Sequence, residues 1–327
     1  MSMIRKIQKI RQTPSLAIAY MADFIKALFR ALLLTGLSVI ILYPLMYSLS
    51  IALRPASELY DPLVVLVPKT FVWDNMKNAI HYLDYNEALG NSIILVCICT
   101  FLQVASCAMA GYGLARYRFR GSKLIFALVL LTMLVPPQTV LIPTFMNFRF
   151  FDPFGLVSLF NAVTGKDVNI NLINSPMAFY LPAAFGNGIR SGVIIFIFRQ
   201  FFRGLPRELE EAAYLDGCNS GGTFLRVMVP NTGGAFLITV LISIVWYWND
   251  YVYTSSLLSN YKTVMNQLYI LKNHINHIMQ YDVGASTQEG ILILQSGVFL
   301  CILPPLLLYL ILQKNFRESV ERSGIVG

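Results

Sequence analysis

Five long windows of this sequence contain no charged residue, and they constrain the fold more than any other feature. They cover residues 31–53, 88–115, 124–148, 227–249 and 290–313, and each is 23 to 28 residues long. A stretch of about 18 apolar residues without charge is long enough to cross a bilayer as a helix. The sequence therefore predicts at least five membrane-spanning helices.

The composition agrees with a membrane protein and excludes the soluble classes. Of the 327 residues, 56% are hydrophobic and only 13% are charged, with a mean hydropathy of +0.61. A soluble domain carries about 25% charged residues, and disordered chains are poor in hydrophobic ones. We therefore expect an integral, all-α membrane protein.

A sixth span is expected between residues 167 and 207, because the sidedness of the loops requires one there. Its apolar centre, residues 191–198, is short, so the helix has to extend from about Gly188 to Phe202 to cross the membrane. Arg190 and Arg199 would then reach toward the two interfaces. The prediction is six transmembrane helices.

The charges of the connecting segments predict which side is which. The N-terminus, the loops at 116–123 and 199–226 and the C-terminal tail hold 17 Lys/Arg against 7 Asp/Glu, whereas the other loops hold 8 against 10. The basic side is cytoplasmic by the positive-inside rule, which places both termini in the cytoplasm. The net charge of +8 is then a topology signal, and no nucleic-acid partner is expected, since that would need a soluble basic face.

The chain divides into three regions on this basis. Residues 1–27 form an N-terminal segment, 28–313 the transmembrane domain, and 314–327 a cytoplasmic tail. Within residues 3–11, four apolar side chains fall on one helical stripe among basic ones. That pattern predicts a short helix lying on anionic membrane lipid, with a solvated tail as the alternative.

Several transport and catalytic classes lack the residues that they need. The spans hold no Asp or Glu away from their ends, which disfavours an ion-coupled carrier. No phosphate-binding P-loop occurs, and Gly111 and Gly113 at a span end are assigned to close helix packing. His274 and His277 are too few for a metal site. We expect neither an enzyme nor a chain that binds a metal or a nucleotide.

One predicted cytoplasmic loop has a helical pattern of its own. In residues 204–217, Pro206 suits a first turn, glutamates follow near the positive end of the helix dipole, and Gly217 is a left-handed stop. The pattern predicts a helix of about three turns, and a second short helix from about Ser220 that ends before Pro230. One stripe of the first helix suits either docking to another protein or covering the ends of the spans: Leu209, Ala212, Ala213 and Asp216.

This loop resembles the EAA loop of the permeases of ABC importers. Glu211-Ala212-Ala213 is followed after three residues by Gly217 and, after nine more, by Val227-x-Val229-Pro230. The family pattern has Ile and Leu where this chain has the two valines. Further motifs, from about Leu28 to the end, are similar to the smaller permease of maltose-type sugar importers: Asn91-Ser92, residues 110–116, 119–121 and 133–137, Phe201-Phe202 and Trp248-Asn249-Asp250. The stretch 157–185 is longer than the corresponding outer loop of that family.

The resemblance implies a type I ABC importer permease fold of six spans in a bacterial inner membrane. The segment 206–216 would be the coupling helix, seated in a cleft of an ATPase. Glu211 would be an acidic contact there, Ala212 and Ala213 the close-approach surface beside Asp216, and Gly217 a hinge. The implied partners are a second related permease, two ATPase subunits that hold the ATP and Mg, and an external solute-binding protein.

The implied cargo is a carbohydrate, most simply an oligosaccharide. Sugars are bound by aromatic faces with a few hydrogen-bonding groups, and one set near the span ends has that character: Asn91, Gln138, Tyr247, Trp248 and Asn249. The alternative for Tyr247 and Trp248 is the interfacial aromatic belt. Arg149 and Arg190, expected at the outer edge, leave a sugar acid or glycerol phosphate open as cargo. The alternative from another class is a self-sufficient secondary transporter.

Overall fold

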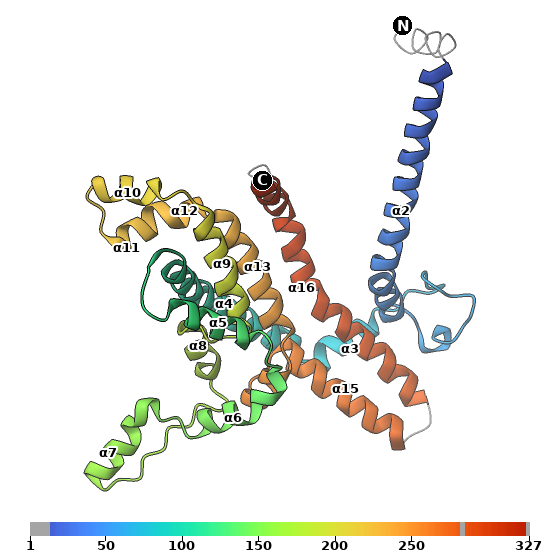
Figure 1. Ribbon diagram of the computed structural model, residues 1–327. Coiled ribbons are helices and arrows are strands. Elements are labelled where there is room, and N and C mark those ends of the chain that lie inside the picture. The colour runs from blue at the N-terminus through green and yellow to red at the C-terminus, as the bar shows by residue number, and fades with distance from the viewer. Residues whose placement is uncertain (1–13, 282–284, 325–327) are drawn as a thin grey trace.

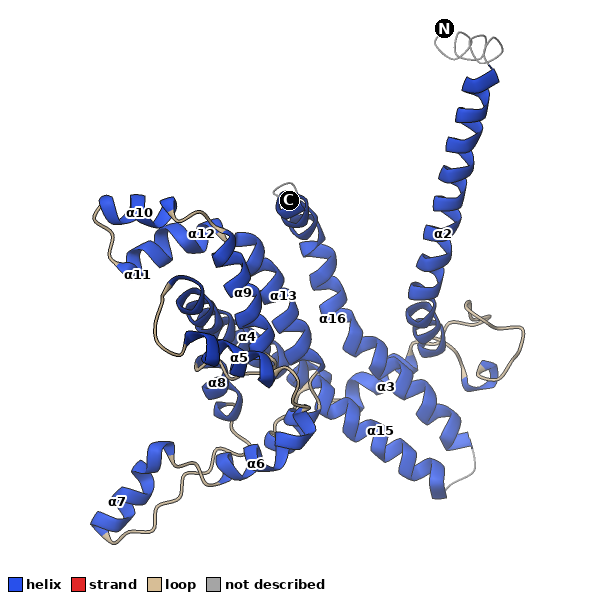
Figure 2. Ribbon diagram, viewed as in Figure 1, coloured by secondary structure: helices blue, strands red, loops and turns tan. Residues whose placement is uncertain are grey.

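The computed structural model describes residues 14–281 and 285–324, and every regular element in these ranges is helical (Figures 1 and 2). The amphipathic segment predicted at residues 3–11 lies outside the described residues. The longer helices are α2 (Pro14–Ala52), α3 (Asp74–Tyr82), α4 (Tyr85–Arg116), α5 (Ser122–Thr132), α6 (Pro137–Arg149), α7 (Leu156–Thr164), α8 (Met177–Ala184), α9 (Ser191–Gly204), α10 (Glu208–Leu215), α13 (Gly233–Asn249), α15 (Val264–Tyr281) and α16 (Ala285–Gly324). Short helical segments lie between them: η1 (Ala56–Glu58), η2 (Pro153–Gly155), α11 (Ser220–Thr223), η3 (Phe224–Met228), α12 (Val229–Asn231) and α14 (Val252–Leu257).

Helix α4 is the centre of the packed body. Helices α9, α13 and α8 pack against it, and α16 packs against α13, α15, α3 and the end of α2. Two clusters of buried apolar side chains follow α4 along its length. One surrounds Leu95 and Cys99 with Trp248 from α13, and the other surrounds Cys107 with Phe198 and neighbouring residues of α9. The body is therefore built around one long apolar helix.

The contact between α4 and α9 depends on a glycine. A Cβ at Gly111 would stand 2.6 Å from Cβ of Phe198 and 3.0 Å from the backbone N of Arg199. At Gly113, two positions further along α4, no neighbouring atom lies within 4 Å of the position that a Cβ would take. Close packing through a small residue is therefore confirmed for Gly111 and is wrong for Gly113.

We expect Gly111→Ala to lower the stability of the protein and Gly113→Ala to leave it unchanged or slightly raised. The first substitution overpacks the α4–α9 contact, which costs about 1–3 kcal/mol. The second gains the higher helix propensity of alanine at no steric cost. Thermal unfolding of the purified protein in detergent measures both changes. Equal unfolding temperatures for the two variants would contradict the close contact at Gly111.

Two of the predicted spans are bent in the structure. The window 124–148 divides into α5 and a segment that starts at Pro137, with an angle of 103° between them. Pro136 has an extended backbone (ψ 135°), as expected for a residue that precedes proline. The window 227–249 contains an angle of 81° before α13 begins at Gly233. One straight helix over either window was therefore the wrong prediction.

By length and composition, three described helices can cross a membrane, and five if each bent pair counts as one span. The predicted fourth span starts as a helix only at Ser191 rather than at Gly188, and α9 has 14 residues. The six-span count remains a prediction. The start of α2 and the end of α16 point toward the same end of the molecule as α10 (Figure 1), in the arrangement expected if both termini share the side of the loop 204–217.

Helix α2 has almost no apolar partner within the chain. It is apolar over Met21–Ala52, yet none of its most hydrophobic window is buried. Figure 1 shows it standing apart from the α4 body, joined to it only near its foot. There its last turns contact α16. A helix of this kind is covered by lipid or by another protein.

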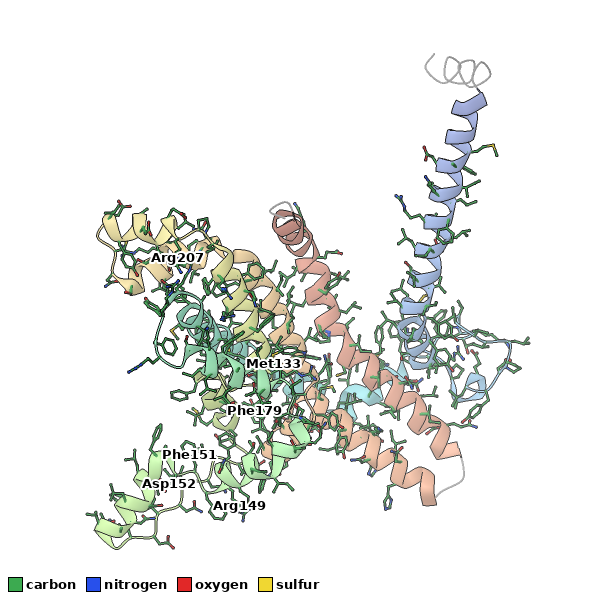
Figure 3. The ribbon with its side chains drawn as sticks, in the orientation of Figure 1. Met133, Arg149, Phe151, Asp152, Phe179 and Arg207 are labelled. Atoms are coloured by element: carbon green, nitrogen blue, oxygen red, sulfur yellow. The ribbon has the colours of Figure 1, made fainter. Side chains whose placement is uncertain are left out.

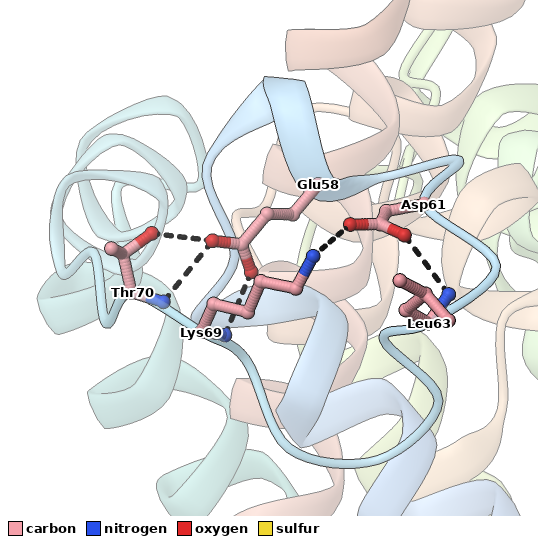
Figure 4. A network of polar contacts seen from close by, with 5 residues as sticks. All are labelled: Glu58, Asp61, Leu63, Lys69 and Thr70. Atoms are coloured by element: carbon pink, nitrogen blue, oxygen red, sulfur yellow. Dashed lines mark hydrogen bonds and ion pairs between the residues drawn. The ribbon is translucent and has the colours of Figure 1, made fainter.

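The loop after α2 is held in shape by polar contacts (Figure 4). The buried carboxylate of Glu58 accepts hydrogen bonds from the backbone N–H groups of Lys69 and Thr70, at 2.9 and 3.1 Å, and from the Thr70 hydroxyl at 2.6 Å. Lys69 also binds Asp61. The Thr70 hydroxyl bond is the main cause that lowers the pKa of Glu58. The ionised Glu58 carboxylate therefore stabilises the folded loop at pH values above the ordinary carboxyl pKa. This stabilisation is lost as the pH falls through the lowered pKa of Glu58 in the folded protein.

Candidate functional site

The loop between α9 and α13 contains the predicted helical pair, and Figure 1 shows it at one end of the body. Helix α10 covers Glu208–Leu215, which is two turns rather than the predicted three. The helix starts late because Leu205, which precedes Pro206, has an extended backbone (ψ 144°). The predicted left-handed stop is confirmed, since Gly217 has φ +82°.

The second predicted helix begins where expected but ends later. Asn219 accepts a hydrogen bond at 2.7 Å from the backbone N–H of Gly222, and this cap starts α11 at Ser220. The chain then passes through the π-helical turn η3 and α12 as far as Asn231. The predicted end before Pro230 was wrong, because the helical backbone continues through the π-helical turn and includes Pro230.

A buried polar contact ties α10 to the end of α4. The Tyr112 hydroxyl donates a hydrogen bond of 2.8 Å to Glu210, and Nε of Arg116 lies 3.6 Å from the other carboxylate oxygen. Arg116 also donates to the carbonyl of Leu205 at 2.8 Å. The side chains of Arg116 and Glu210 are only 6% and 14% exposed. The sequence analysis missed this role of Glu210. The signal was its position three residues before Ala213, on the inward face of the same helix.

An aromatic cluster fixes the base of the loop to the spans. The ring of Tyr112 lies 5.4 Å from that of Phe202 on α9 and 5.0 Å from that of Phe224 in η3. The Phe202 and Phe224 rings are 6.0 Å apart. These are ordinary distances for paired aromatic rings. Together with the Glu210 contact they join α10, η3, α4 and α9.

The outward face of α10 differs from the predicted one. Glu211, Ala212 and Asp216 are exposed, as a docking surface requires, but Ala213 is 4% exposed and packs within the chain. The prediction that Ala212 and Ala213 together form the close-approach surface is therefore corrected, because only Ala212 is exposed. Leu215, which the sequence analysis did not select, is 89% exposed. It lies four residues after Glu211, on the same face of the helix.

We expect Gly217→Val to weaken the loop, and Gly217→Asn to be tolerated. No neighbouring atom lies within 4 Å of the Cβ position, so the cost comes from the backbone, which is left-handed at φ +82°. That conformation costs an ordinary L-residue about 1–2 kcal/mol, and asparagine adopts it more easily than a β-branched residue. Limited proteolysis within residues 204–231 measures the loosening. If both variants are cleaved equally fast, the left-handed stop is not the constraint.

The residues predicted to line a substrate path do not gather at one site. Tyr247 and Trp248 are 4% and 7% exposed and belong to the core, which also excludes the interfacial aromatic belt for both. The Trp248 indole donates a hydrogen bond of 3.0 Å to the carbonyl of Cys301 on α16. Both side chains pack within the chain in this structure, whereas the sequence analysis placed them in the substrate path.

The other three predicted path residues lie apart from one another. Asn91 donates a hydrogen bond of 3.1 Å to the carbonyl of Lys262, and it belongs to an outer contact in which the Lys262 ammonium lies 2.9 Å from both Asp84 and Glu87. Hydrogen bonds to these two carboxylates raise the pKa of Lys262 to about 12. Gln138 and Asn249 are exposed on α6 and α13. Of the five, only these two are open to contact with another molecule.

No cluster in the described part of the chain has the composition of a metal site. Among the residues that the structure describes, no three His, Cys, Asp or Glu side chains come together. A small cavity of about 10 Å³ lies beside Trp248, Asp250 and Thr254 and is too small for a sugar. A larger, open pocket of about 450 Å³ lies along α2, beside Leu42, Tyr43 and Leu66.

The comparisons with known proteins agree with the fold. Residues 105–322 match the family described as binding-protein-dependent transport system inner membrane component. The chain is 29% identical to the arabinooligosaccharides transport system permease protein AraQ of Bacillus subtilis (strain 168), over 89% of this chain and 92% of AraQ. It is 26% identical to the trehalose transport system permease protein SugB of Mycobacterium tuberculosis (strain CDC 1551 / Oshkosh), over 88% and 93%.

Among solved structures, a bacterial ABC transporter described as importing the acidic polysaccharide alginate contains a chain of similar fold. The TM-score is 0.65 at 21% identity, and the match covers 90% of this chain and 98% of the other. At this identity the likeness concerns the fold alone. The all-α permease architecture predicted from the sequence is confirmed.

Proposed function

The chain belongs to the family of binding-protein-dependent transport system inner membrane components, and on this premise we propose that it helps to form the path of an ATP-driven importer for a carbohydrate, most simply an oligosaccharide. As a member of the family it is a multi-pass permease of the inner membrane and not an enzyme. It works with an ATPase component and a solute-binding protein. The carbohydrate cargo rests on the similarity to the permeases named for arabinooligosaccharides and trehalose.

The observation that carries the coupling role is the divided surface of α10. Its inward face is fixed to α4 through Glu210, at 2.8 Å from Tyr112. Its outward face exposes Glu211, Ala212 and Leu215. We propose that this outward face docks on an ATPase subunit. A closing movement of the ATPases would then pull on α10 and, through Glu210 and the aromatic cluster, on α4 and α9 as one body.

We propose a second related permease as the neighbour of this chain. Helix α2 supports this, because none of the most hydrophobic window within its apolar length, Met21–Ala52, is buried against the residues that the structure describes. Two ATPase subunits would then serve the two coupling loops, and ATP and Mg would bind to them rather than to this chain.

Purification of the tagged chain in mild detergent from its native membrane, followed by mass spectrometry, tests this assembly. We expect a second permease and a P-loop ATPase to co-purify, and a solute-binding protein to stimulate ATP hydrolysis of the complex. In proteoliposomes the complex should then take up an oligosaccharide in the presence of ATP. A chain that purifies alone and still moves solute without ATP would establish the secondary transporter instead.

A further inference from the structure

The chain between α8 and α9 leaves the helical conformation for six residues. Helix α8 ends at Ala184 and α9 begins at Ser191. Two residues of the intervening segment have left-handed backbones, Gly186 at φ +69° and Arg190 at φ +53°. A non-helical segment leaves carbonyl groups without their helical partners, which inside a membrane is tolerated only beside protein or a water-filled cavity.

Two polar side chains of α4 bind carbonyl groups at this break. The amide of Gln103 donates a hydrogen bond of 2.7 Å to the carbonyl of Ile189 within it, and the Ser106 hydroxyl donates one of 2.7 Å to the carbonyl of Ala183 in the last turn of α8. Gln103 is fully buried. The break is therefore a built feature of the fold, and it lies at the level of Gln103 and Ser106 on α4.

That level is the middle of the membrane-spanning part of α4. Glu87 lies 16 positions before Gln103, and Arg116 lies 13 positions after it. At about 1.5 Å per residue these separations are roughly 24 and 20 Å. The break, and Arg190 within it, are thus near the midpoint between the two charged ends of the span. This corrects the expectation that Arg190 stands at the outer edge.

Arg190 presents its charge at this depth without an acidic partner. Its side chain is exposed, and no ion pair or side-chain hydrogen bond joins it to any other residue among those that the structure describes. Its guanidinium carbon lies 5.2 Å from the ring centroid of Trp246 on α13. Phe185, 82% exposed, and exposed Asn187 belong to the same break. Because charge at mid-membrane depth faces a polar cavity rather than lipid, this group of residues lies on the side of the solute path.

We infer that Arg190, Trp246 and Asn187 form a cargo site for a carboxylate-bearing oligosaccharide, a sugar acid rather than a neutral sugar. The guanidinium is permanently charged and binds a carboxylate through two parallel hydrogen bonds. Arg190 also stands at the N-terminal end of α9, without a side-chain hydrogen bond to the helix, where the positive end of the helix dipole adds to its charge. The indole of Trp246 and the amide of Asn187 suit the face and hydroxyl groups of a sugar ring. This inference rests on the proposed carbohydrate importer.

Uptake by the complete complex in proteoliposomes, with its solute-binding protein, tests this inference. The probes are trigalacturonate and the same trisaccharide with its carboxyl groups reduced to alcohols. We expect the acidic probe to be taken up preferentially. Arg190→Gln should raise the KM for the acidic probe at least tenfold and that for the neutral probe much less, and Arg190→Lys should restore part of the difference. Arg149→Gln is the matched control, since Arg149 is also an exposed arginine beside a ring, Phe150, but at the end of α6 (Figure 3).

The possible results separate this inference from the proposed function. ATP-driven uptake of the neutral probe alone, or equal effects of Arg190→Gln on both probes, would overturn the sugar-acid site and leave the importer intact. A complex that takes up neither probe also overturns it. The importer itself fails only if the solute-binding protein does not stimulate ATP hydrolysis. Stimulation that is normal in Arg190→Gln shows that this variant is folded and assembled.

Discussion

Replacement of Glu211 by lysine is expected to reduce ATP-driven uptake to background while the protein still inserts into the membrane. The carboxylate is exposed on the outward face of α10, and it has no hydrogen bond or ion pair with any other residue that the structure describes. Within this chain its charge therefore contributes only the interaction of the first turn of α10 with the helix dipole. A reversed charge at the proposed ATPase contact would replace attraction by repulsion, and like charges at an interface cost several kcal/mol.

The measurement is uptake by cells and by reconstituted complex, with membrane insertion followed by immunoblot. Lys123→Glu is the matched control, because it also reverses an exposed charge, at the start of α5. We expect that control to transport normally. A compensating charge reversal on the ATPase should restore uptake by the Glu211→Lys protein. Normal uptake by Glu211→Lys, with the ATPase still bound, would exclude the coupling contact.

Replacement of Glu210 by alanine is expected to separate ATP hydrolysis from uptake. The substitution leaves the guanidinium of Arg116, 6% exposed, without its carboxylate. Removing one partner of a buried ion pair costs about 3–5 kcal/mol. The expected results are a lower unfolding temperature, a more mobile α10, and uptake reduced at least tenfold at an ATPase rate that falls much less.

Three further variants resolve the contact into its parts. Glu210→Gln keeps an acceptor for the Tyr112 hydroxyl but loses the charge, and it should be intermediate. Tyr112→Phe removes one hydrogen bond, worth about 1 kcal/mol, and should be mild. Glu208→Ala, at an exposed position of the same helix, should have no effect. If Glu210→Ala lowers stability but leaves uptake per ATP hydrolysed unchanged, Glu210 is a structural residue only.

The predictions of long membrane helices succeeded because of the physics of the bilayer. A chain in lipid has to satisfy its backbone hydrogen bonds internally, so the apolar windows 31–53, 88–115 and 290–313 correctly predicted helices, which the structure extends to α2, α4 and α16. The left-handed stop at Gly217 was predictable because few other residues adopt that conformation. Helix ends were less predictable, since prolines had different effects. Pro136 lies at the bend between α5 and α6, Leu205 before Pro206 is extended, and Pro230 lies inside a helix.

The sequence by itself determined the all-helical membrane fold, the family and the presence of a helical loop between α9 and α13. Only the tertiary structure decided which way individual side chains face: Ala213 and Glu210 inward, Ala212 and Glu211 outward, and Trp248 into the core. Periodicity shows which residues share a helix face but not what that face meets, because lipid and protein core both accept apolar side chains. The depth of Arg190 was decided by a contact between Gln103 and Ile189, 86 positions apart. No local pattern encodes such a contact, since it exists only once the helices are packed.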